Sequence, residues 1–283
     1  MSRIVYVNGQ FVPEEKAFIP LMDRSFLFGD GIYEVSAIIN GKLVDNDAHL
    51  ARLARSLNEI DIPNPYSIEE WISKQSELAL NNNLTEGIIY IQVSRGVLER
   101  EFTSPDNLKP TVVMFAQKKV ILDAPLAKTG AKIITVPDQR WERRDIKSVS
   151  LLAQVLAKRA SHNAGAHEAW MVEDGFITEG ASSTAFIITS QGEIITRPLS
   201  NDILPGITRM SVIELAQNEG LKIVERPFTV AEALAANEAF YTSASSFVMP
   251  VISIDDQNIG TGLPGKLSVS LRKIYINIAL QSV

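Results

Sequence analysis

The sequence predicts a mixed fold of the α+β or α/β class, with a small N-terminal domain and a larger C-terminal one. The first observation is length, because 283 residues suffice for about two domains at roughly 100–200 residues each. The second is that apolar runs typical of strands, such as Ile32–Ile39 and Gly87–Ser94, are interspersed with helical patterns. The third is composition, since 46% hydrophobic and 21% charged residues are ordinary values for a globular protein with a full core.

Residues 1–117 are predicted to form the small α/β domain. Asn8-Gly9 favours a tight hairpin between Ile4–Val7 and Gln10–Val12, because Asn-Gly tolerates positive φ. Apolar residues at three- and four-residue steps predict an amphipathic helix over Ala48–Ile60. Pro20–Gly31 is expected to be irregular. The other predicted elements are strands Ile32–Ile39, Lys42–Val44, Gly87–Ser94 and Thr111–Ala116, a helix from the Ser67–Glu70 capping box to about Asn81, and a polar loop over Arg95–Pro110.

Residues 118–128 are predicted to connect this domain to a large domain over residues 129–283, with β-barrel-like α/β architecture implied by the resemblance given below. Turns are predicted at Asp174-Gly175 and Gln191-Gly192, and Gly220 is expected to end a helix. The predicted strands are Ala131–Val136, Glu168–Val172, Thr184–Thr189, Glu193–Thr196, Leu221–Val224, Ala239–Thr242 and Val251–Ile254, and the predicted helices cover Leu151–Ala164, Val230–Ala235 and stretches beginning near Thr208 and Pro264.

Composition also excludes several classes of function. A net charge of -6 and a pI near 5.3, without a basic block, argue against nucleic-acid binding and against an anionic membrane surface. The absence of Cys removes thiol catalysis and disulfides, and His49, His162 and His167 lack the spacing of a catalytic zinc site. No apolar run is long enough to span a membrane, and the N-terminus does not resemble a signal peptide, so a cytoplasmic protein is expected.

Lys147 is the first candidate for chemistry. A lysine is usually a solvated surface charge, so its position alone decides nothing. The alternative is a lysine that forms a Schiff base with an aldehyde cofactor, which requires an amine whose pKa is depressed by burial or by neighbouring cations. Arg143 and Arg144 precede Lys147 and could supply those cations.

Three further segments of the second half fit the same kind of ligand. Glu179, followed by Gly and small hydroxyl residues just before a predicted strand, could keep a pyridine nitrogen protonated. Gly206 precedes a predicted helix start, where free N–H groups suit a phosphate. Thr242–Ser246 is a hydroxyl-rich turn after a predicted strand and could supply further phosphate donors. Each feature is also common in plain surface turns and helix caps. One aromatic, anionic, aldehyde-bearing ligand, pyridoxal 5′-phosphate, would account for all of them.

Over nearly its full length the chain resembles the fold-type IV pyridoxal-phosphate enzymes, and within them the D-amino-acid aminotransferases most closely. Five segments in family order carry this resemblance: Asp23–Glu34, His49–Leu53, Asp145–Ser148, Thr178–Gly180 and Gly206–Arg209. The resemblance implies that Lys147 is the imine-forming lysine that moves the substrate proton, and that Glu179 contacts the pyridine nitrogen. It implies a phosphate site formed by Arg52, Ile207, Thr208, Ser243, Ala244 and Ser245, with Leu204 packed against the ring.

The resemblance also implies a homodimer in which the loop of Arg100 reaches the active site of the partner subunit. Tyr33 and Arg100 match residues that hold the substrate carboxylate, and Phe102 stands where the family has a histidine donor. The expected reaction is transamination between a D-amino acid and a 2-oxo acid through pyridoxamine phosphate. The alternatives are an (R)-selective amine:pyruvate aminotransferase, a branched-chain L-amino-acid aminotransferase, a 4-amino-4-deoxychorismate lyase and a non-enzymatic binding module.

Overall fold

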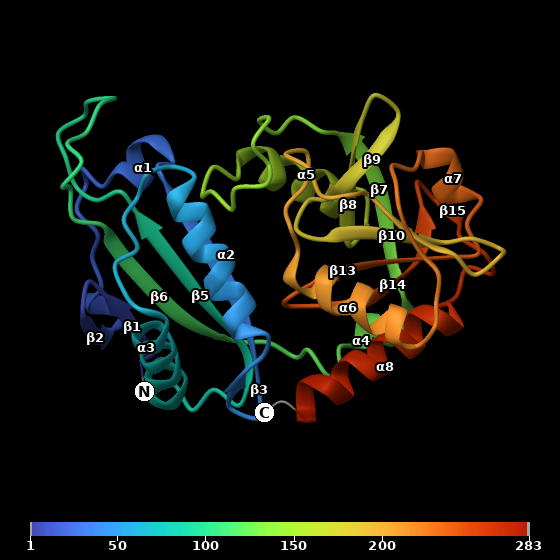
Figure 1. Cartoon of the computed structure of the whole chain (residues 1–283), viewed down its shortest axis with the longest axis horizontal. Helices are drawn as coiled ribbons and strands as arrows, with labels where there is room; N and C mark the ends of the chain where they lie inside the picture. The colour runs from blue at the N-terminus through green and yellow to red at the C-terminus, as the bar shows by residue number, and fades with distance from the viewer. Residues whose placement is uncertain (1, 282–283) are drawn as a thin grey trace. The chain divides into compact units, whose positions relative to one another are not determined.

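A computed structural model of the chain describes residues 2–281, and these divide into two compact units (Figure 1). Unit 1 contains the described residues up to Val120 together with Ile146–Ser150, and unit 2 contains Ile121–Asp145 and Leu151–Gln281. The domain boundaries drawn from the sequence remain a proposal, and residues 1 and 282–283 of those domains lie outside the described part. The units differ from them chiefly by grouping the Lys147 segment with the N-terminal part of the chain.

Unit 1 is built on a six-stranded antiparallel sheet covered by two long helices. Its elements are strands β1 (Ile4–Val7), β2 (Gln10–Pro13), β3 (Gly31–Ile39), β4 (Lys42–Leu43), β5 (Glu86–Ser94) and β6 (Thr111–Lys118), helices α1 (Arg24–Phe28), α2 (Asn46–Asn58) and α3 (Ile68–Asn81), and a 3-10 turn at Glu14–Lys16. The strand order is β2-β1-β6-β5-β3-β4. Helix α2 contacts β3, α3 contacts β6 and β1, and the two helices contact each other, so both cover the same face of the sheet (Figure 1).

The core of unit 1 lies between these helices and the sheet. The leucine stripe predicted for α2 is buried there, with Leu53 fully enclosed, and it meets Trp71 of α3 and Ile89 of β5. The Asn8-Gly9 hairpin and the capping box at Ser67, in which both hydrogen bonds form, are confirmed. The elements expected from local patterns in this unit therefore form with boundaries within a few residues.

The stretch Pro20–Gly31, expected to be irregular, instead contains the short helix α1. The Asp23 carboxylate accepts a hydrogen bond from the Ser25 N–H at its start, and Gly29 ends it with a left-handed φ of 68°. A helix of five residues is too short to show apolar periodicity, which is why the pattern of hydrophobic residues missed it.

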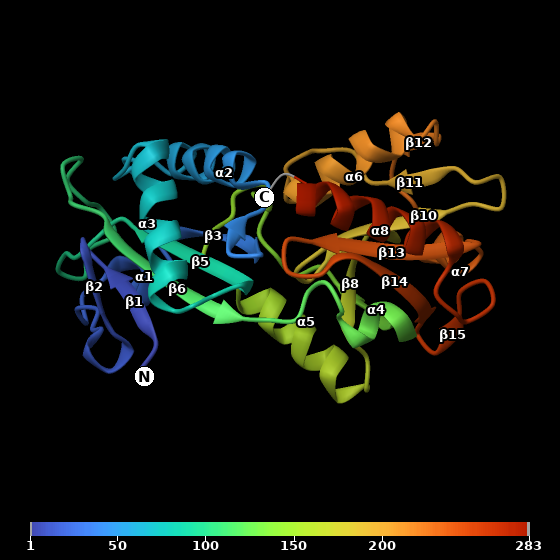
Figure 2. The same ribbon diagram turned by 90° about the horizontal axis from the view of Figure 1, so that it is seen from below.

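Unit 2 is built on a nine-stranded mixed sheet. Its strands are β7 (Ala131–Pro137), β8 (Glu168–Glu173), β9 (Phe176–Gly180), β10 (Thr184–Ile188), β11 (Ile194–Thr196), β12 (Ile223–Glu225), β13 (Glu238–Ser243), β14 (Phe247–Ile254) and β15 (Gln257–Asn258), and its helices are α4 (Pro125–Thr129), α5 (Leu152–Asn163), α6 (Ile207–Asn218), α7 (Val230–Leu234) and α8 (Lys266–Gln281). The order is β12-β11-β10-β13-β14-β7-β8-β9, with β15 beside β14. Helices α6 and α8 lie next to each other against β13, whereas α5 covers β7 and β8 (Figure 2).

Three strands of unit 2 differ from expectation, and one of them is β15, which was not predicted. Strand β9 was not predicted, so Glu179 lies inside a strand rather than in a turn before one, because the Asp174-Gly175 turn folds β9 back against β8. Strand β14 begins at Phe247 and contains Pro250. Proline is tolerated there because β7 pairs with β14 only from Val251 onward, which leaves Pro250 with one neighbouring strand.

The core of unit 2 surrounds Trp170, which is fully buried and packs edge-on against Phe228. The hairpin of β10 and β11 around Gln191-Gly192 is confirmed, as is the helix that ends just before Gly220. The fold class expected from the sequence, a small α/β part and a larger one on a β-rich sheet, is the fold observed. None of the helices within residues 2–281 is both long and apolar enough to cross a membrane.

Candidate active site

Lys147 lies in a short segment that is held against the start of β3 in unit 1. The N–H of Tyr33 donates to the carbonyl oxygen of Lys147 at 2.9 Å, and the N–H of Val149 donates to the carbonyl oxygen of Gly31 at 3.0 Å. On its other side, the N–H of Lys147 donates to the hydroxyl of Ser56 in α2 at 3.3 Å. The backbone of the lysine is therefore fixed by a strand and a helix of the same unit.

The amine of Lys147 lies over an aromatic ring. Its Nζ is 4.2 Å from the centroid of the Tyr33 ring, within the range of a cation–π contact. Tyr33 in turn stacks on Tyr90, and Tyr90 stacks on Phe115. Since each ring is braced by the next, the row limits the positions open to Tyr33 and so defines the surface on which the lysine side chain rests.

The two arginines expected to act as neighbouring cations have partners of their own. Arg143 pairs with Asp145 at 3.0 Å, and Arg144 pairs with Glu173 at 2.6 Å, all within unit 2. Their charges are compensated by these ion pairs.

Arg52, the residue expected at the phosphate, belongs to a buried charge cluster in unit 1. Its Nε donates to Oε1 of Glu34 at 2.6 Å and its Nη2 to Oε2 at 2.9 Å, a bidentate pair between α2 and β3. His49, one helical turn before Arg52, contacts the same carboxylate through Nδ1 at 2.9 Å. Burial acts to raise the pKa of Glu34, but the charges and hydrogen bonds of Arg52 and His49 hold this pKa well below its usual range. Glu34 therefore fixes the direction of the Arg52 side chain.

Glu179 belongs to a second buried cluster, in unit 2. Its Oε1 accepts a hydrogen bond from Arg140 and one from the N–H of Leu204 at 3.1 Å. Arg140 is shared, because its Nη2 also donates to Asp138 at 2.6 Å, and Asp138 accepts from the Thr178 hydroxyl at 2.6 Å. Oε2 of Glu179 accepts no hydrogen bond from the rest of the described chain.

The charge on Glu179 is consequently less well compensated than that on Glu34. Burial raises the pKa of Glu179, and although Arg140 and the Leu204 N–H act in the opposite direction, Asp138 adds a like charge nearby. The result is a carboxyl whose pKa lies above its usual value, with one oxygen available. An additional donor or positive charge at that oxygen would stabilise the ionised form.

The two segments expected to bind phosphate converge in unit 2. Thr184 of β10 pairs with Thr242 at the end of β13, and a Cβ on Gly206 would lie 2.8 Å from the Thr184 hydroxyl. Gly206 is the N-cap of α6 and offers no side-chain cap, so the first N–H groups of this 12-residue helix are available to an anion. The turn of Ser243, Ala244 and Ser245 follows Thr242 directly. Ile207 and Thr208 are buried at the helix start.

The expected substrate residues are only partly brought together. Tyr33 lies beside Lys147, as described above. Arg100 is exposed in the loop after β5, and its guanidinium lies over the rings of Phe28 and Phe102 at 5.5 and 5.8 Å. Arg24 holds this loop by donating to the carbonyl oxygen of Phe102 at 3.1 Å. Within the described residues Arg100 takes part in no ion pair.

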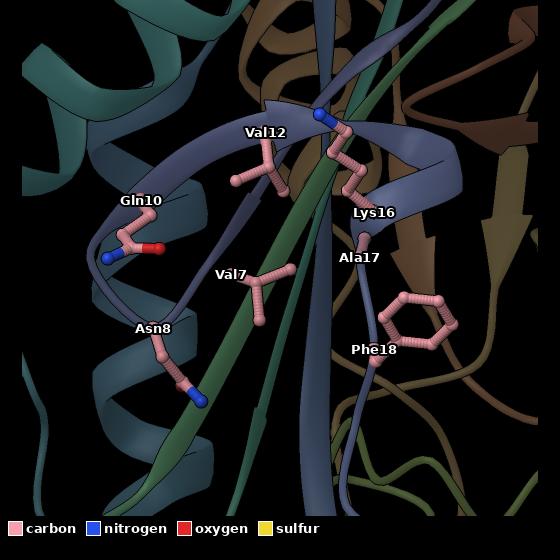
Figure 3. Close-up of a pocket in the computed structure, with 7 residues that line it drawn as sticks. All are labelled: Val7, Asn8, Gln10, Val12, Lys16, Ala17 and Phe18. Carbon is pink, nitrogen blue, oxygen red and sulfur yellow. The ribbon is translucent and has the colours of Figure 1, made fainter.

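Several residues of these clusters were not found from the sequence. Asp138 and Arg140 follow β7 in a segment without a recognisable pattern, and Glu34 appeared only as part of a longer motif. Their roles depend on which strands become neighbours. The described residues contain no group of His, Asp and Glu side chains suited to a metal ion. A hollow of about 340 Å³ beside the β1–β2 hairpin, with Lys16 and Phe18 on its rim, contains none of the candidate site residues (Figure 3).

Comparison with known proteins places these clusters in a family. The model of the family described as amino-transferase class IV matches residues 31–254, which include Glu34, Lys147 and Glu179. The chain belongs to the class IV aminotransferases. It is therefore a PLP-dependent aminotransferase, and the recognition made from the five motifs is confirmed, with the cofactor that it implied.

Individual relatives span nearly all of this class IV aminotransferase. It is 38% identical over 282 residues to a D-alanine aminotransferase of Bacillus licheniformis, covering 98% of this chain and 97% of the relative. It is 39% identical to one of Staphylococcus epidermidis, covering 95% of both. Among solved structures, a branched-chain amino acid aminotransferase of Thermobaculum terrenum in its PLP form has a TM-score of 0.86 at 22% identity, covering 99% of this chain and 94% of the other, and supports the fold. One of Thermoproteus uzoniensis with norvaline has a TM-score of 0.85 at 27% identity, covering 99% and 96%.

The residues of this class IV aminotransferase fit the cofactor. A protonated pyridine nitrogen is the kind of partner that the available oxygen of Glu179 lacks. A phosphate suits the uncapped start of α6, where Gly206 leaves room that a side chain would fill. Thr242 has a buried hydroxyl without a partner in the described part of the chain, immediately before the serine turn. The first feature matches the pyridine nitrogen of the cofactor, and the other two match its phosphate.

Proposed function

We propose that the protein transfers an amino group between a D-amino acid, such as D-alanine or D-glutamate, and a 2-oxo acid. The observation that carries this proposal is the 38% identity to a D-alanine aminotransferase over 98% of the chain. Branched-chain aminotransferases share the fold, but the structural relatives named above are only 22% and 27% identical. Sequence similarity across the full chain therefore favours D-amino acids as donors.

The proposed roles of the residues follow from their surroundings. Bound PLP supplies an electron sink that makes the Cα proton of the attached substrate removable. Lys147 would hold PLP covalently through its Nζ, and once the amino group of the substrate has displaced it, the same amine would accept the substrate proton and give it back. Glu179 would stabilise the protonated pyridine nitrogen, and Leu204 would pack against the ring.

The phosphate is proposed to be held by charge and by backbone N–H groups. Arg52, aligned by Glu34, contributes the cation. Ile207 and Thr208 contribute the N–H groups of the α6 start, and the Ser243–Ser245 turn adds hydroxyl and backbone donors. The serine turn retains a hydroxyl at each end, while Ala244 can offer only its N–H.

Tyr33 and Arg100 are proposed to bind the substrate carboxylate, with Arg100 supplied by the partner subunit of a homodimer. Exposed aromatic rings on unit 1 support the dimer, because Phe18 is 79%, Phe26 73% and Phe102 80% exposed. Large exposed rings of this kind are characteristic of surfaces that a partner covers. A cytoplasmic location stays a prediction from the sequence.

The proposal is tested with a panel of amino donors, read as half-reactions from the colour change of the bound cofactor. D-Alanine and D-glutamate are expected to convert the cofactor, while L-leucine leaves it unchanged. Conversion by L-leucine alone would show instead a branched-chain L-amino-acid aminotransferase. Pyruvate released from aminodeoxychorismate without an amino acceptor would identify a lyase, and a preparation that stays colourless after addition of PLP would contradict every enzymatic assignment.

An (R)-selective amine:pyruvate aminotransferase is the second candidate, and one observation favours it. Arg100 stacks on Phe28 and Phe102, and Phe102 provides apolar area where the resemblance places a histidine donor. An apolar wall suits a primary amine without a carboxylate. The panel therefore includes (R)-1-phenylethylamine, and a reaction with this amine but not with D-alanine would establish the second candidate.

A further inference from the structure

The turn after β13 has an unusual backbone. Phe247, its last residue and the first of β14, has a φ of +56°, although it is a bulky residue and not a glycine. L residues of this size rarely adopt the left-handed region, so the surroundings must impose the conformation. The side chain of Phe247 is fully buried and packs edge-on against Tyr275 of α8, with 4.8 Å between the ring centroids.

Arg272 of α8 holds the peptide groups on both sides of Phe247. Its Nη1 donates to the carbonyl oxygen of Ser246 at 2.6 Å and to that of Val248 at 2.9 Å. Its Nη2 donates to the carbonyl oxygens of Ile121 and Leu122, the latter at 3.4 Å. All four acceptors are neutral carbonyls, so Arg272 acts here as a set of geometrically fixed donors rather than as half of an ion pair.

Burying a charged guanidinium against neutral acceptors costs free energy. Arg272 is only 6% exposed, and burial lowers its pKa. Arg272 and Tyr275 are three residues apart, so one face of α8 supplies both the donors and the ring that fix Phe247. What they fix is the end of the turn that begins at Ser243.

We propose that Arg272 is a positioning residue for the phosphate of PLP: by clamping the peptides around Phe247 it holds the Ser243–Ser245 turn in its phosphate-binding conformation. This inference rests on the proposed phosphate site. The unpaired, buried hydroxyl of Thr242, directly before the turn, points independently to an occupant with hydrogen-bonding oxygens. Arg272 itself does not touch the cofactor and acts through the turn.

The test compares PLP with pyridoxal, which lacks the phosphate, by equilibrium dialysis against the apoenzyme. For Arg272→Met the dissociation constant of PLP is expected to rise by about tenfold or more, because charged donors to the turn are lost. The dissociation constant of pyridoxal is expected to change little. Arg272→Lys retains a donor and is expected to fold and to show a smaller loss with the same preference for PLP.

Lys273→Met is the matched control, since Lys273 is exposed and adjacent on the same helix, and it is expected to bind both compounds like the unmodified enzyme. Equal weakening of PLP and pyridoxal in both Arg272 variants, or no weakening, would overturn the positioning role. Ser245→Ala separates the role of Arg272 from that of the turn. If Ser245→Ala selectively weakens the binding of PLP while the Arg272 variants do not, only the role of Arg272 is wrong. If Ser245→Ala has no selective effect on PLP binding, the assignment of the turn to the phosphate is wrong.

Discussion

The two units of this class IV aminotransferase each bury a glutamate beside an arginine, yet the two carboxyls have opposite pKa shifts. Glu34 of unit 1 receives both nitrogens of a bidentate Arg52 and a contact from His49, and its pKa is lowered. Glu179 of unit 2 shares its arginine with Asp138, and its pKa is raised. The comparison shows that burial alone does not decide the charge state; the number of donors and the nearest like charge do.

The difference has a functional meaning. A carboxylate that is fully satisfied by its own chain, such as Glu34, serves to align another side chain. A carboxylate with an available oxygen and a raised pKa, such as Glu179, is prepared to receive a proton-bearing ligand. Unit 1 thus contains a buried carboxylate whose charge is compensated within the chain, whereas unit 2 contains a buried carboxyl with one oxygen available to a ligand.

The largest expected effect tests whether Lys147 of unit 1 supplies the amine that reacts. Lys147→Ala is expected to reduce turnover by roughly a thousandfold or more, because covalent binding and proton transfer are lost together. The fold is expected to survive, which circular dichroism would show. Lys132→Ala, at an exposed lysine of unit 2, is the control and should keep full turnover. Transamination that persists in Lys147→Ala would refute the assignment of this lysine.

The next effect compares how much each of the two carboxylates contributes to the stability of the protein. Glu34→Gln removes the charge of the bidentate partner of Arg52 and is expected to lower the free energy of unfolding of the apoenzyme by about 3 kcal/mol. Glu179→Gln is expected to change it by less than about 1 kcal/mol, since Arg140 keeps Asp138 and the removed charge was disfavoured. Urea denaturation of both variants measures the difference. Equal losses would mean that the two clusters are energetically equivalent.

A smaller effect concerns substrate recognition in unit 1. Arg100→Ala is expected to raise the KM for D-alanine by about tenfold, because the substrate carboxylate loses one charged hydrogen-bonding partner. The KM for a simple amine should hardly change. Lys109→Ala, at an exposed lysine of the same loop, is the control. A similar change for both kinds of substrate would show that Arg100 does not bind the carboxylate.

The smallest effect is the pH dependence of apoenzyme stability. Because the pKa of Glu34 is lowered in the folded protein, its stabilising contribution is complete above the ordinary carboxyl pKa of 4.5 and is lost as the pH falls below it. For Glu179 the sign is reversed, because its pKa is raised: the ionised form costs stability at high pH, and protonation removes that cost as the pH falls toward 4.5.

The measurement is the unfolding free energy of the unmodified enzyme relative to each glutamine variant between pH 7 and pH 4.5. Relative to Glu179→Gln, the unmodified enzyme should gain stability as the pH falls across this range. Relative to Glu34→Gln, its advantage should stay constant. Parallel curves for the two variants would contradict the opposite pKa shifts.

Features encoded within a few residues were predictable from the sequence. The Asn8-Gly9 hairpin, the capping box at Ser67 and the leucine stripe of α2 depend on neighbours at most four residues apart. The five motifs gave the family, because they preserve chemistry that a cofactor requires. Lys147 and Glu179 were proposed as site residues in this way, and PLP is the cofactor that the family uses.

Features that depend on distant parts of the chain were not predictable. Asp138 and Thr178 meet because β7 pairs with β8 and β8 with β9, which brings together residues 40 positions apart. Arg272 reaches Ser246 only because α8 returns to pack on β14. No local pattern records such pairings. Strand β9 and helix α1 were missed for a related reason, since short elements stabilised by their context carry little periodicity of their own.

The separate cores of the two units also give the protein a built-in spectroscopic reporter for each. Of its three tryptophans, Trp71 is buried in unit 1, whereas Trp170 is buried in unit 2 and Trp141 is 48% exposed there. In Trp71→Phe the indole fluorescence therefore arises from unit 2 alone. In Trp141→Phe/Trp170→Phe it arises from unit 1 alone. Emission maxima followed through a urea titration would then show whether the two units lose their cores in one transition or in two.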